Sequence, residues 1–419
     1  IEWRNKCKEL AIKYVNIQKE QFKRLGVRAD WENSYLTLSP EYQANQIDVF
    51  GRMALDGFIY RSLRPVAYCY HCETVLSEDE IEYSKIKIPS IYVAFTLKEK
   101  FKDLDNVKVM IWTTTPWTIP GNTGIAVSPS MDYVLIKQSN NYYIFSEDLF
   151  EKSAYNCNFK NYEILERFSG IELEGLIASH PLYDRESKII LANYVTSDKG
   201  TGCVHIAPAH GIEDYQASLK YNLPVINPID DSGKYTKEAG ENLKGLIAEK
   251  SNGVIIDLLK NNLYATVEIE IDYPHCWRCH NPIIHRALKQ WFVDIGSLAD
   301  KAIINMNNVE WVPEWGYKRM RGMVENRSDW CISRQRTWGV PIPVFYCMSC
   351  GKELINEKSI KTVRDLVAKF GSNVWFEKNA EDILDKEEKC CHCGGNKFSK
   401  ETDIMSVWFN SGCSHYCVL

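Results

Sequence analysis

The chain has 419 residues, of which 45% are hydrophobic and 25% are charged, and its formal net charge is -5. This composition excludes disordered and fibrous proteins, and no apolar run reaches the roughly 20 residues that a membrane-spanning helix needs. The negative net charge also excludes nucleic-acid binding through the charge of the whole chain, so any RNA contact must be local. The length predicts two to four compact units of roughly 100–200 residues.

Two helices are predicted at the start of the chain. Apolar residues recur at helical spacing from Cys7 to Leu25, and Gly26 follows where a C-terminal cap is expected. A second helix is predicted to begin after Ser39, an N-cap residue that is followed by Pro40 at the first helical position. Helix therefore dominates this part of the chain.

Short β-rich runs follow, and a further helix is expected near Val254–Leu259. Short strands between turn signals indicate a compact barrel or sandwich. The predicted strands are Tyr92–Leu97, Val107–Thr115, Ile125–Val127 and Lys188–Thr196, with a hairpin through Tyr133–Lys137 and Tyr142–Phe145.

Eight of the fifteen cysteines fall into four C-x-x-C pairs. This spacing favours metal binding in a reducing compartment over disulfides, which indicates the cytoplasm. Pairing the last two knuckles closes a zinc-ribbon loop of about 40 residues and leaves the first two knuckles for each other, so that each site has four thiolates. The expected ligands are Cys69, Cys72, Cys276 and Cys279 in one site, and Cys347, Cys350, Cys390 and Cys393 in the other.

Two structural zinc ions are therefore expected, since four protein ligands leave no open coordination position for catalysis. Neither site offers the three closely spaced cysteines of a ferredoxin-type iron–sulfur centre. Cys391 is an alternative to Cys390 as a ligand. Four histidines are minor competitors, namely His71, His275, His280 and His392.

Two polar elements are candidates for a binding or catalytic site. A run of threonines ends an apolar strand, and a glycine-rich segment farther along contains a histidine that could pair with an aspartate in a pocket. Each element by itself is a weak signal, because threonine is an ordinary strand residue and a single histidine is as often structural. The candidate residues are Thr113, Thr114, Thr115, Asn122, His205 and Asp214.

Five motifs in order along the chain together resemble the isoleucyl-tRNA synthetases, a branch of the class I aminoacyl-tRNA synthetases. Thr115 favours this branch, because the valine and leucine enzymes typically carry arginine at that place. The motifs are WTTTPWTIPGN (112–122), GTGCVHIAPAHGIEDY (200–215), CWRCHNPIIHRA (276–287), DWCISRQRTWGVPIP (329–343) and SVWFNSG (406–412).

The resemblance implies an α/β fold in which a Rossmann-type catalytic domain is interrupted by a β-barrel-like editing domain, with two zinc-ribbon knuckle sites. The implied boundaries are catalytic-domain segments and connecting helices at 1–66, 286–346 and 401–419, a zinc stem at 67–83 and 273–285, an editing domain at 84–272, and a zinc-ribbon insertion at 347–400.

The resemblance also implies the activity of the full-length enzyme, which attaches isoleucine to its tRNA with ATP and Mg²⁺ and hydrolyses mischarged valyl-tRNA in the editing domain. A cytoplasmic monomer is implied. The HIGH and KMSKS signatures, which hold ATP in this family, do not occur in the sequence. We therefore expect that this segment by itself does not activate isoleucine.

The family's site residues map onto the candidates above. Asp214 would bind the α-ammonium of the aminoacyl group, and His205 would line the side-chain pocket and exclude isoleucine. The threonines 113–115 would bind the terminal adenosine and position water, with Asn122 in support. No covalent nucleophile is required.

In the catalytic segments, Trp408 would pack against the isoleucine side chain, and Arg334 to Trp338 would lie near the acceptor end of tRNA. Asn410 departs from the aspartate that is common in this motif, which leaves the local polarity open.

Two other classes of protein remain as alternatives. A free-standing trans-editing deacylase would lack the catalytic flanks, and a non-catalytic zinc-ribbon RNA-binding module would not explain the threonine and His–Asp elements.

Overall fold

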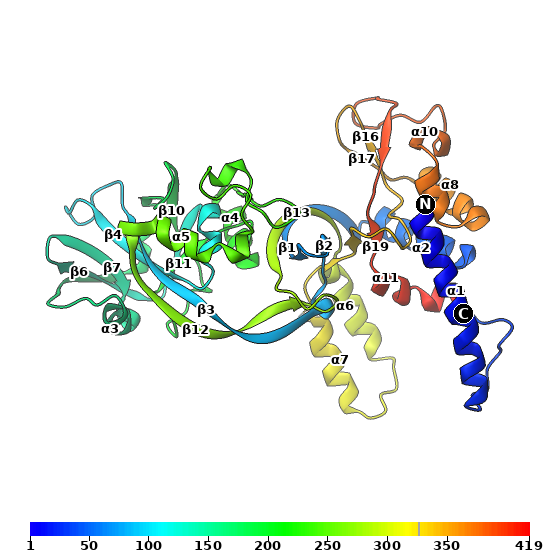
Figure 1. Ribbon diagram of the computed structural model, residues 1–419, viewed down its shortest axis with the longest axis horizontal. Coiled ribbons are helices and arrows are strands. Elements are labelled where there is room, and N and C mark those ends of the chain that lie inside the picture. The colour runs from blue at the N-terminus through cyan, green and yellow to red at the C-terminus, as the bar shows by residue number, and fades with distance from the viewer. Residues whose placement is uncertain (326) are drawn as a thin grey trace. The chain divides into compact units, whose positions relative to one another are not determined.

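The computed structural model describes residues 1–325 and 327–419, which form two compact units. Unit 1 comprises Ile1–Ser62 and Gln290–Leu419, and unit 2 comprises Leu63–Lys289. Helices and strands occur in both units, so the chain is of the α/β class (Figure 1). The chain leaves unit 1 in strand β1 (Ile59–Cys69) and returns in strand β13 (Ile284–Val293), which makes unit 2 an insertion.

The two predicted helices at the start of unit 1 are confirmed. Helix α1 (Glu2–Arg24) has its C-cap at Leu25, and Gly26 follows with a φ of +79°. Helix α2 (Pro40–Leu55) begins as predicted, because the side chain of Ser39 accepts a hydrogen bond from the backbone N–H of Tyr42 at 3.3 Å.

The rest of unit 1 consists of short elements around one core. Its strand pairs β13 with β14, β15 with β19, and β16 with β17 and β18 are all antiparallel. The elements are α6 (Ile295–Met306), α7 (Trp315–Glu325), α8 (Glu357–Phe370), α9 (Asn373–Glu377), α10 (Ala380–Ile383), α11 (Val407–Gly412), α12 (Ser414–Val418), β14 (Trp330–Cys331), β15 (Ser333–Arg334), β16 (Phe345–Cys347), β17 (Glu353–Leu354), β18 (Phe398–Lys400) and β19 (Ile404–Met405).

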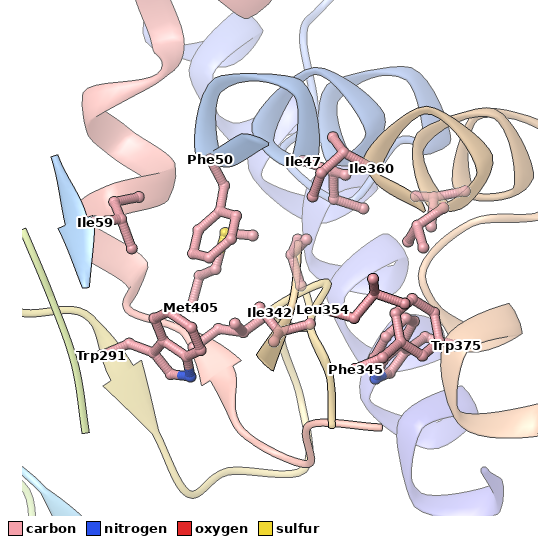
Figure 2. Close-up of a cluster of buried hydrophobic side chains, with 14 of the residues drawn as sticks. Ile47, Phe50, Ile59, Trp291, Ile342, Phe345, Leu354, Ile360, Trp375 and Met405 are labelled. Atoms are coloured by element: carbon pink, nitrogen blue, oxygen red, sulfur yellow. The ribbon is translucent and has the colours of Figure 1, made fainter. Parts of the chain in front are cut away.

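Aromatic side chains fill this core together with aliphatic ones (Figure 2). Phe50 of α2 meets Trp291 of β13 edge to face, with ring centroids 6.2 Å apart. Phe345 lies against Trp375, with centroids 5.0 Å apart. Aromatic pairs of this kind stabilise a core beyond the area that they bury, and they hold α2 and the short strands in one unit.

Unit 2 is built on a ten-stranded mixed sheet. The main strand order is β8-β6-β7-β4-β11-β5-β10-β9, and β3 pairs with both β4 and β12. The strands are β3 (Ile81–Thr96), β4 (Val107–Thr113), β5 (Gly124–Val127), β6 (Asp132–Gln138), β7 (Asn141–Ser146), β8 (Glu163–Ser169), β9 (Ile177–Ser179), β10 (Glu186–Leu191), β11 (Cys203–Ile206) and β12 (Leu263–Cys276). The other elements include β2 (Thr74–Val75), α3 (Glu147–Asn156), α4 (Ile212–Tyr221) and α5 (Asn252–Leu259).

Strands β3 and β12 form a long antiparallel ribbon (Figure 1). The register runs from the pair Val93 and Leu263 to the pair Ile81 and Cys276, which brings the end of β12 to a cysteine knuckle. The ribbon lies largely outside the predicted strands, because its exposed charged half lacks the apolar runs on which the strand prediction depended.

The strand predictions are otherwise confirmed in part. The predicted hairpin is present as β6 and β7, and α5 covers the predicted helix. Strand β4 stops at Thr113, two residues early, and the predicted strand end at 192–196 is wrong. There the backbone turns instead, with the N–H of Val195 donating to the carbonyl of Ala192. No helix within residues 1–325 or 327–419 is long and apolar enough to cross a membrane.

The core of unit 1 generates a stability prediction. Phe50 is fully buried, so Phe50→Ala should lower the free energy of unfolding by about 3–5 kcal/mol, through lost transfer energy and the cavity left behind. Phe370→Ala is the matched control, because that ring is 57% exposed and its loss should change stability by about 0.5 kcal/mol at most. Denaturant unfolding of both variants checks this, and equal losses would contradict it.

Candidate functional site

The threonine run and His205 meet because their strands are neighbours in the sheet. Strand β11 lies between β4 and β5, with Val204 opposite Trp112 on one side and His205 opposite Ile125 on the other. The turn before β11 needs glycine at 202, where φ is +76° and a Cβ atom would stand 2.2 Å from the Cβ of Ser146. The two polar elements thus occupy one part of unit 2.

His205 is held at both ring nitrogens by hydrogen bonds. The side-chain amide of Asn122 has a fixed orientation, because its Nδ2 donates to the carbonyl of Gly124 at 2.8 Å and its Oδ1 accepts from the hydroxyl of Ser187 at 2.5 Å. Nδ2 therefore also donates to Nδ1 of His205, at 2.7 Å. The ring proton must then lie on Nε2, which donates to the hydroxyl of Thr118 at 2.9 Å.

The imidazole of His205 is neutral. Burial, reinforced by the nearby His180 and His210, lowers its pKa to about 3. A neutral ring with both nitrogens committed cannot act as a general base without breaking this network. What His205 offers to a ligand is therefore the shape of a rigid, buried ring.

A chain of hydroxyls connects His205 to the threonine run. Thr118 donates to the backbone carbonyl of Thr115 at 2.8 Å, and its hydroxyl lies 3.2 Å from that of Thr115. The hydroxyl of Thr115 lies 3.4 Å from that of Thr113. The 3-10 helix Pro116–Gly121, capped by Thr115, creates the contact between Thr115 and Thr118, because residues three apart lie on the same side of such a helix.

The prediction that His205 and Asp214 form a polar pair is wrong. Asp214 lies in the first turn of α4, where its Oδ2 accepts from the backbone N–H of Ala207 at 2.9 Å and its Oδ1 accepts from the hydroxyl of Tyr194 at 3.3 Å. His205 instead uses Asn122 and Thr118. The partners of His205 come from a segment more than 80 residues earlier in the chain, whereas those of Asp214 lie 7 and 20 residues before it.

The carboxyl group of Asp214 has a raised pKa. Burial raises the pKa of its carboxyl to about 6, and the hydrogen bonds from Ala207 and Tyr194 act in the opposite direction. At neutral pH the carboxylate therefore predominates. A partly buried carboxylate whose contacts here include no cation is suited to receive one from a ligand.

A pocket of about 240 Å³ opens beside these groups. Its wall includes Thr113, Thr114, Tyr194, Lys199 and the glycine-rich turn 200–204. The volume lies just below the roughly 300–1,000 Å³ of pockets for drug-sized ligands, so it suits a small group rather than a large one. Thr115 and His205 stand behind this wall instead of forming it.

Three residues of this network were not singled out from the sequence, namely Thr118, Ser187 and Tyr194. Thr118 had a signal, since it follows Thr115 by three residues within the same polar turn. Ser187 and Tyr194 had none, because they reach Asn122 and Asp214 only through the folding of the sheet.

The first predicted set of cysteines forms one cluster in unit 2. The sulfur atoms of Cys69, Cys72, Cys276 and Cys279 all lie within 4.8 Å of one another, and those of Cys69 and Cys279 are 3.5 Å apart. Four thiolates around a tetrahedral zinc ion, with Zn–S bonds of about 2.3 Å, would be about 3.8 Å apart. The donor set and its spacing therefore fit zinc.

The second predicted set forms an equivalent cluster in unit 1, made by Cys347, Cys350, Cys390 and Cys393. Sulfur separations are 3.5 Å from Cys347 to Cys393 and 3.6 Å from Cys350 to Cys390. The cluster contains Cys390 and not its neighbour Cys391, and among the described residues neither cluster includes a histidine.

All four knuckles share one backbone conformation. The residue after the second cysteine has positive φ in each, and glycine occupies that position only in the second cluster, at Gly351 and Gly394. Glu73 and His280 adopt the same conformation in the first cluster, with φ of 49° and 56°. This turn places the two sulfurs of a knuckle on the same side of the backbone.

The residues of unit 1 that the sequence singled out differ in their exposure to solvent. Trp408, at the start of α11, is 43% exposed and is therefore not a core aromatic. Arg334 is buried, and its guanidinium donates to the carbonyls of Cys331 and Ser333. The side-chain oxygen of Asn410 is buried without a hydrogen-bond partner among the described residues.

The family model described as "tRNA synthetases class I (I, L, M and V)" matches residues 1–419. The chain belongs to this family of class I tRNA synthetases. This agrees with the α/β class and with the motifs in both units.

Curated relatives are similar over the whole chain. "Isoleucine--tRNA ligase" of Carboxydothermus hydrogenoformans is 51% identical over 421 residues, and that of Syntrophomonas wolfei subsp. wolfei is 49% identical over 422 residues. Each match covers 100% of this chain and 45% of the relative, so the chain spans about half the length of these synthetases. A solved structure titled "The crystal structure of GlLeuRS-CP1" matches with a TM-score of 0.35 and 18% identity, over 43% of this chain and 99% of that chain.

The cysteine clusters of this synthetase segment generate a metal prediction. The purified, reduced chain should contain two zinc ions, and Cys69→Ser should contain one and melt at a lower temperature, because zinc binding at such sites is coupled to folding. Cys391→Ser is the matched control and should keep both ions. Elemental analysis with thermal unfolding checks this, and one zinc or none in the folded parent would contradict it.

Proposed function

We propose that this chain is part of an isoleucine–tRNA ligase and carries its editing site, which hydrolyses valyl-tRNA specific for isoleucine. The observation that carries the proposal is the partly buried Asp214 carboxylate, which accepts from two neutral donors among the described residues and is linked through Tyr194 to a small threonine-lined pocket. The high identity to isoleucine–tRNA ligases along the whole chain supports the choice of amino acid.

A second site is needed because the first cannot discriminate well enough. One missing methylene changes binding by only about 1–3 kcal/mol, a range for which isoleucine and valine are themselves the standard example. A pocket that admits valine and excludes isoleucine removes the errors by hydrolysis. The threonine hydroxyls in the wall of the pocket in unit 2 support the binding of a polar aminoacyl ester there.

In the proposed reaction, Asp214 accepts charge-assisted hydrogen bonds from the α-ammonium and thereby fixes the ester in the pocket. Thr113 and Thr114 at the wall bind the terminal adenosine and position a water molecule, with Thr115 held behind them by Thr118. The water oxygen forms the new bond to the ester carbonyl carbon, the bond to the ribose oxygen breaks, and that oxygen takes up a proton. Positioning lowers the barrier of an already activated ester, so no covalent nucleophile is needed.

In this proposal His205 stands behind the pocket wall and stiffens it. Its ring is neutral and fixed by Asn122 and Thr118, so it cannot move aside for a larger side chain. A wall supported in this way does not yield to the extra methylene of isoleucine, which is excluded by steric conflict.

We further propose that unit 2 is a β-barrel editing domain, within the boundaries 84–272. The supporting observation is the bridge between Leu97 and Ala178, which joins the end of β3 to β9. Together with the pairs of β3, β4, β11, β5, β10 and β9 this bridge connects six strands in a ring.

The remaining assignments follow from the same family. Two zinc ions hold the stem at 67–83 and 273–285 and the ribbon at 347–400, and the segments 1–66, 286–346 and 401–419 belong to a Rossmann-type domain in which Trp408 contacts isoleucine. The full-length enzyme uses ATP, Mg²⁺, isoleucine and its tRNA, and works as a cytoplasmic monomer. A free-standing deacylase would have no need of unit 1.

The first test concerns Asp214. Asp214→Ala removes the carboxylate that receives the α-ammonium, so hydrolysis of valyl-tRNA should fall ten- to a hundredfold, as expected for loss of about 1.5–3 kcal/mol of charge-assisted hydrogen bonding. Glu238→Ala, at an exposed position in the same unit, should keep the parent rate. Deacylation kinetics measure both, and a parent rate in Asp214→Ala would refute the assignment.

The second test concerns His205. His205→Ala opens the wall, so isoleucyl-tRNA should be hydrolysed where the parent spares it. His180→Ala is the matched control, because that ring is equally buried but bonds to the backbone of Ile119. It should lower stability without changing which ester is cleaved. If both variants spare isoleucyl-tRNA as the parent does, His205 does not set the size limit.

A further inference from the structure

Tyr194 stands between the pocket and Asp214. It lies in the segment between β10 and β11, and its side chain lines the pocket together with Thr113 and Thr114. Its hydroxyl donates to Oδ1 of Asp214 at 3.3 Å, while the backbone N–H of Ala207 donates to Oδ2 at 2.9 Å. Each oxygen of the carboxylate therefore has its own donor.

Two donors on different oxygens fix the plane of a carboxylate, which is otherwise free to rotate about the Cβ–Cγ bond. Burial raises the pKa of the Tyr194 hydroxyl well above its ordinary value, so this group stays protonated and remains a donor across the accessible pH range. The donor from Ala207 is a backbone N–H, which every substitution except proline retains. Tyr194 is thus the donor that a side-chain substitution can remove without changing the backbone.

We propose that Tyr194 is a positioning residue of the editing site, whose hydroxyl keeps the Asp214 carboxylate ionised and turned for the α-ammonium of the aminoacyl group. The inference rests on the function proposed above. It differs from a purely structural role, because the hydroxyl acts on the charge state of its partner and not only on the packing of the loop.

The surroundings of Asp214 determine the direction of the effect. Glu213 on the same helix repels the carboxylate and raises its pKa, as burial does, whereas the donors from Ala207 and Tyr194 lower it. Removing the Tyr194 hydroxyl leaves the two raising influences and one donor. The pKa of Asp214 should then rise above its present value of about 6. As the pH is lowered, the carboxylate of the variant therefore becomes protonated at a higher pH than that of the parent.

The experiment is the rate of valyl-tRNA hydrolysis by the full 419-residue chain from pH 5 to 7.5, in the parent and in Tyr194→Phe. The parent rate should fall as the pH drops through about 6. In Tyr194→Phe this fall should move up by about one pH unit, which makes the variant about tenfold slower at pH 5 and within about twofold of the parent at pH 7.5.

Tyr221→Phe is the matched control, because the Tyr221 hydroxyl also donates to a carboxylate, that of Glu174 at 2.7 Å, away from the pocket. Its pH profile should coincide with that of the parent. A Tyr194→Phe profile that coincides with the parent, or a loss that is equal at every pH, overturns the proposed role of Tyr194. A parent chain that hydrolyses no valyl-tRNA at any pH overturns the editing function itself, which separates the two failures.

Discussion

The architecture of unit 2 depends on the meeting of two cysteine pairs that stand about 200 residues apart in the chain. Cys69 and Cys279 are separated by 210 positions, yet their sulfur atoms lie 3.5 Å apart. Closing a loop of this length costs about 5 kcal/mol of chain entropy, and a metal ion bound by the four thiolates would offset such a cost. The long ribbon of β3 and β12 then starts from a fixed base and leads to the sheet.

The sheet in turn decides which polar side chains meet. Strand β11 lies between β4 and β5, which brings the threonine run, His205 and Asn122 together. Thr113 and His205, the two most distant of these residues, are 92 positions apart in the sequence. Packing then excludes water from the centre of this group. Every buried polar atom along the path from Asn122 to Thr118 consequently needs a protein partner, and the hydrogen bonds supply one.

Burial has opposite consequences for the two titratable groups of the site. It lowers the pKa of His205 and raises that of Asp214, because in each case the charged form is disfavoured. The histidine is thereby removed from acid–base chemistry at neutral pH. The carboxylate, supported by two donors, stays available for a cation.

The sequence by itself determined the features that depend only on residues close together in the chain. The cap at Ser39, the helix end at Gly26 and the four C-x-x-C spacings each depend on neighbouring residues, and the structure agrees with all of them. It also pointed to the threonine run and Asp214, whose roles stay predictions. Only the tertiary structure gave His205 and Asp214 separate partners and brought in Ser187 and Tyr194. These contacts join strands to a 3-10 helix, and a loop to helix α4, and they form only after the order and register of the sheet have placed those segments side by side, which leaves no mark in the local sequence.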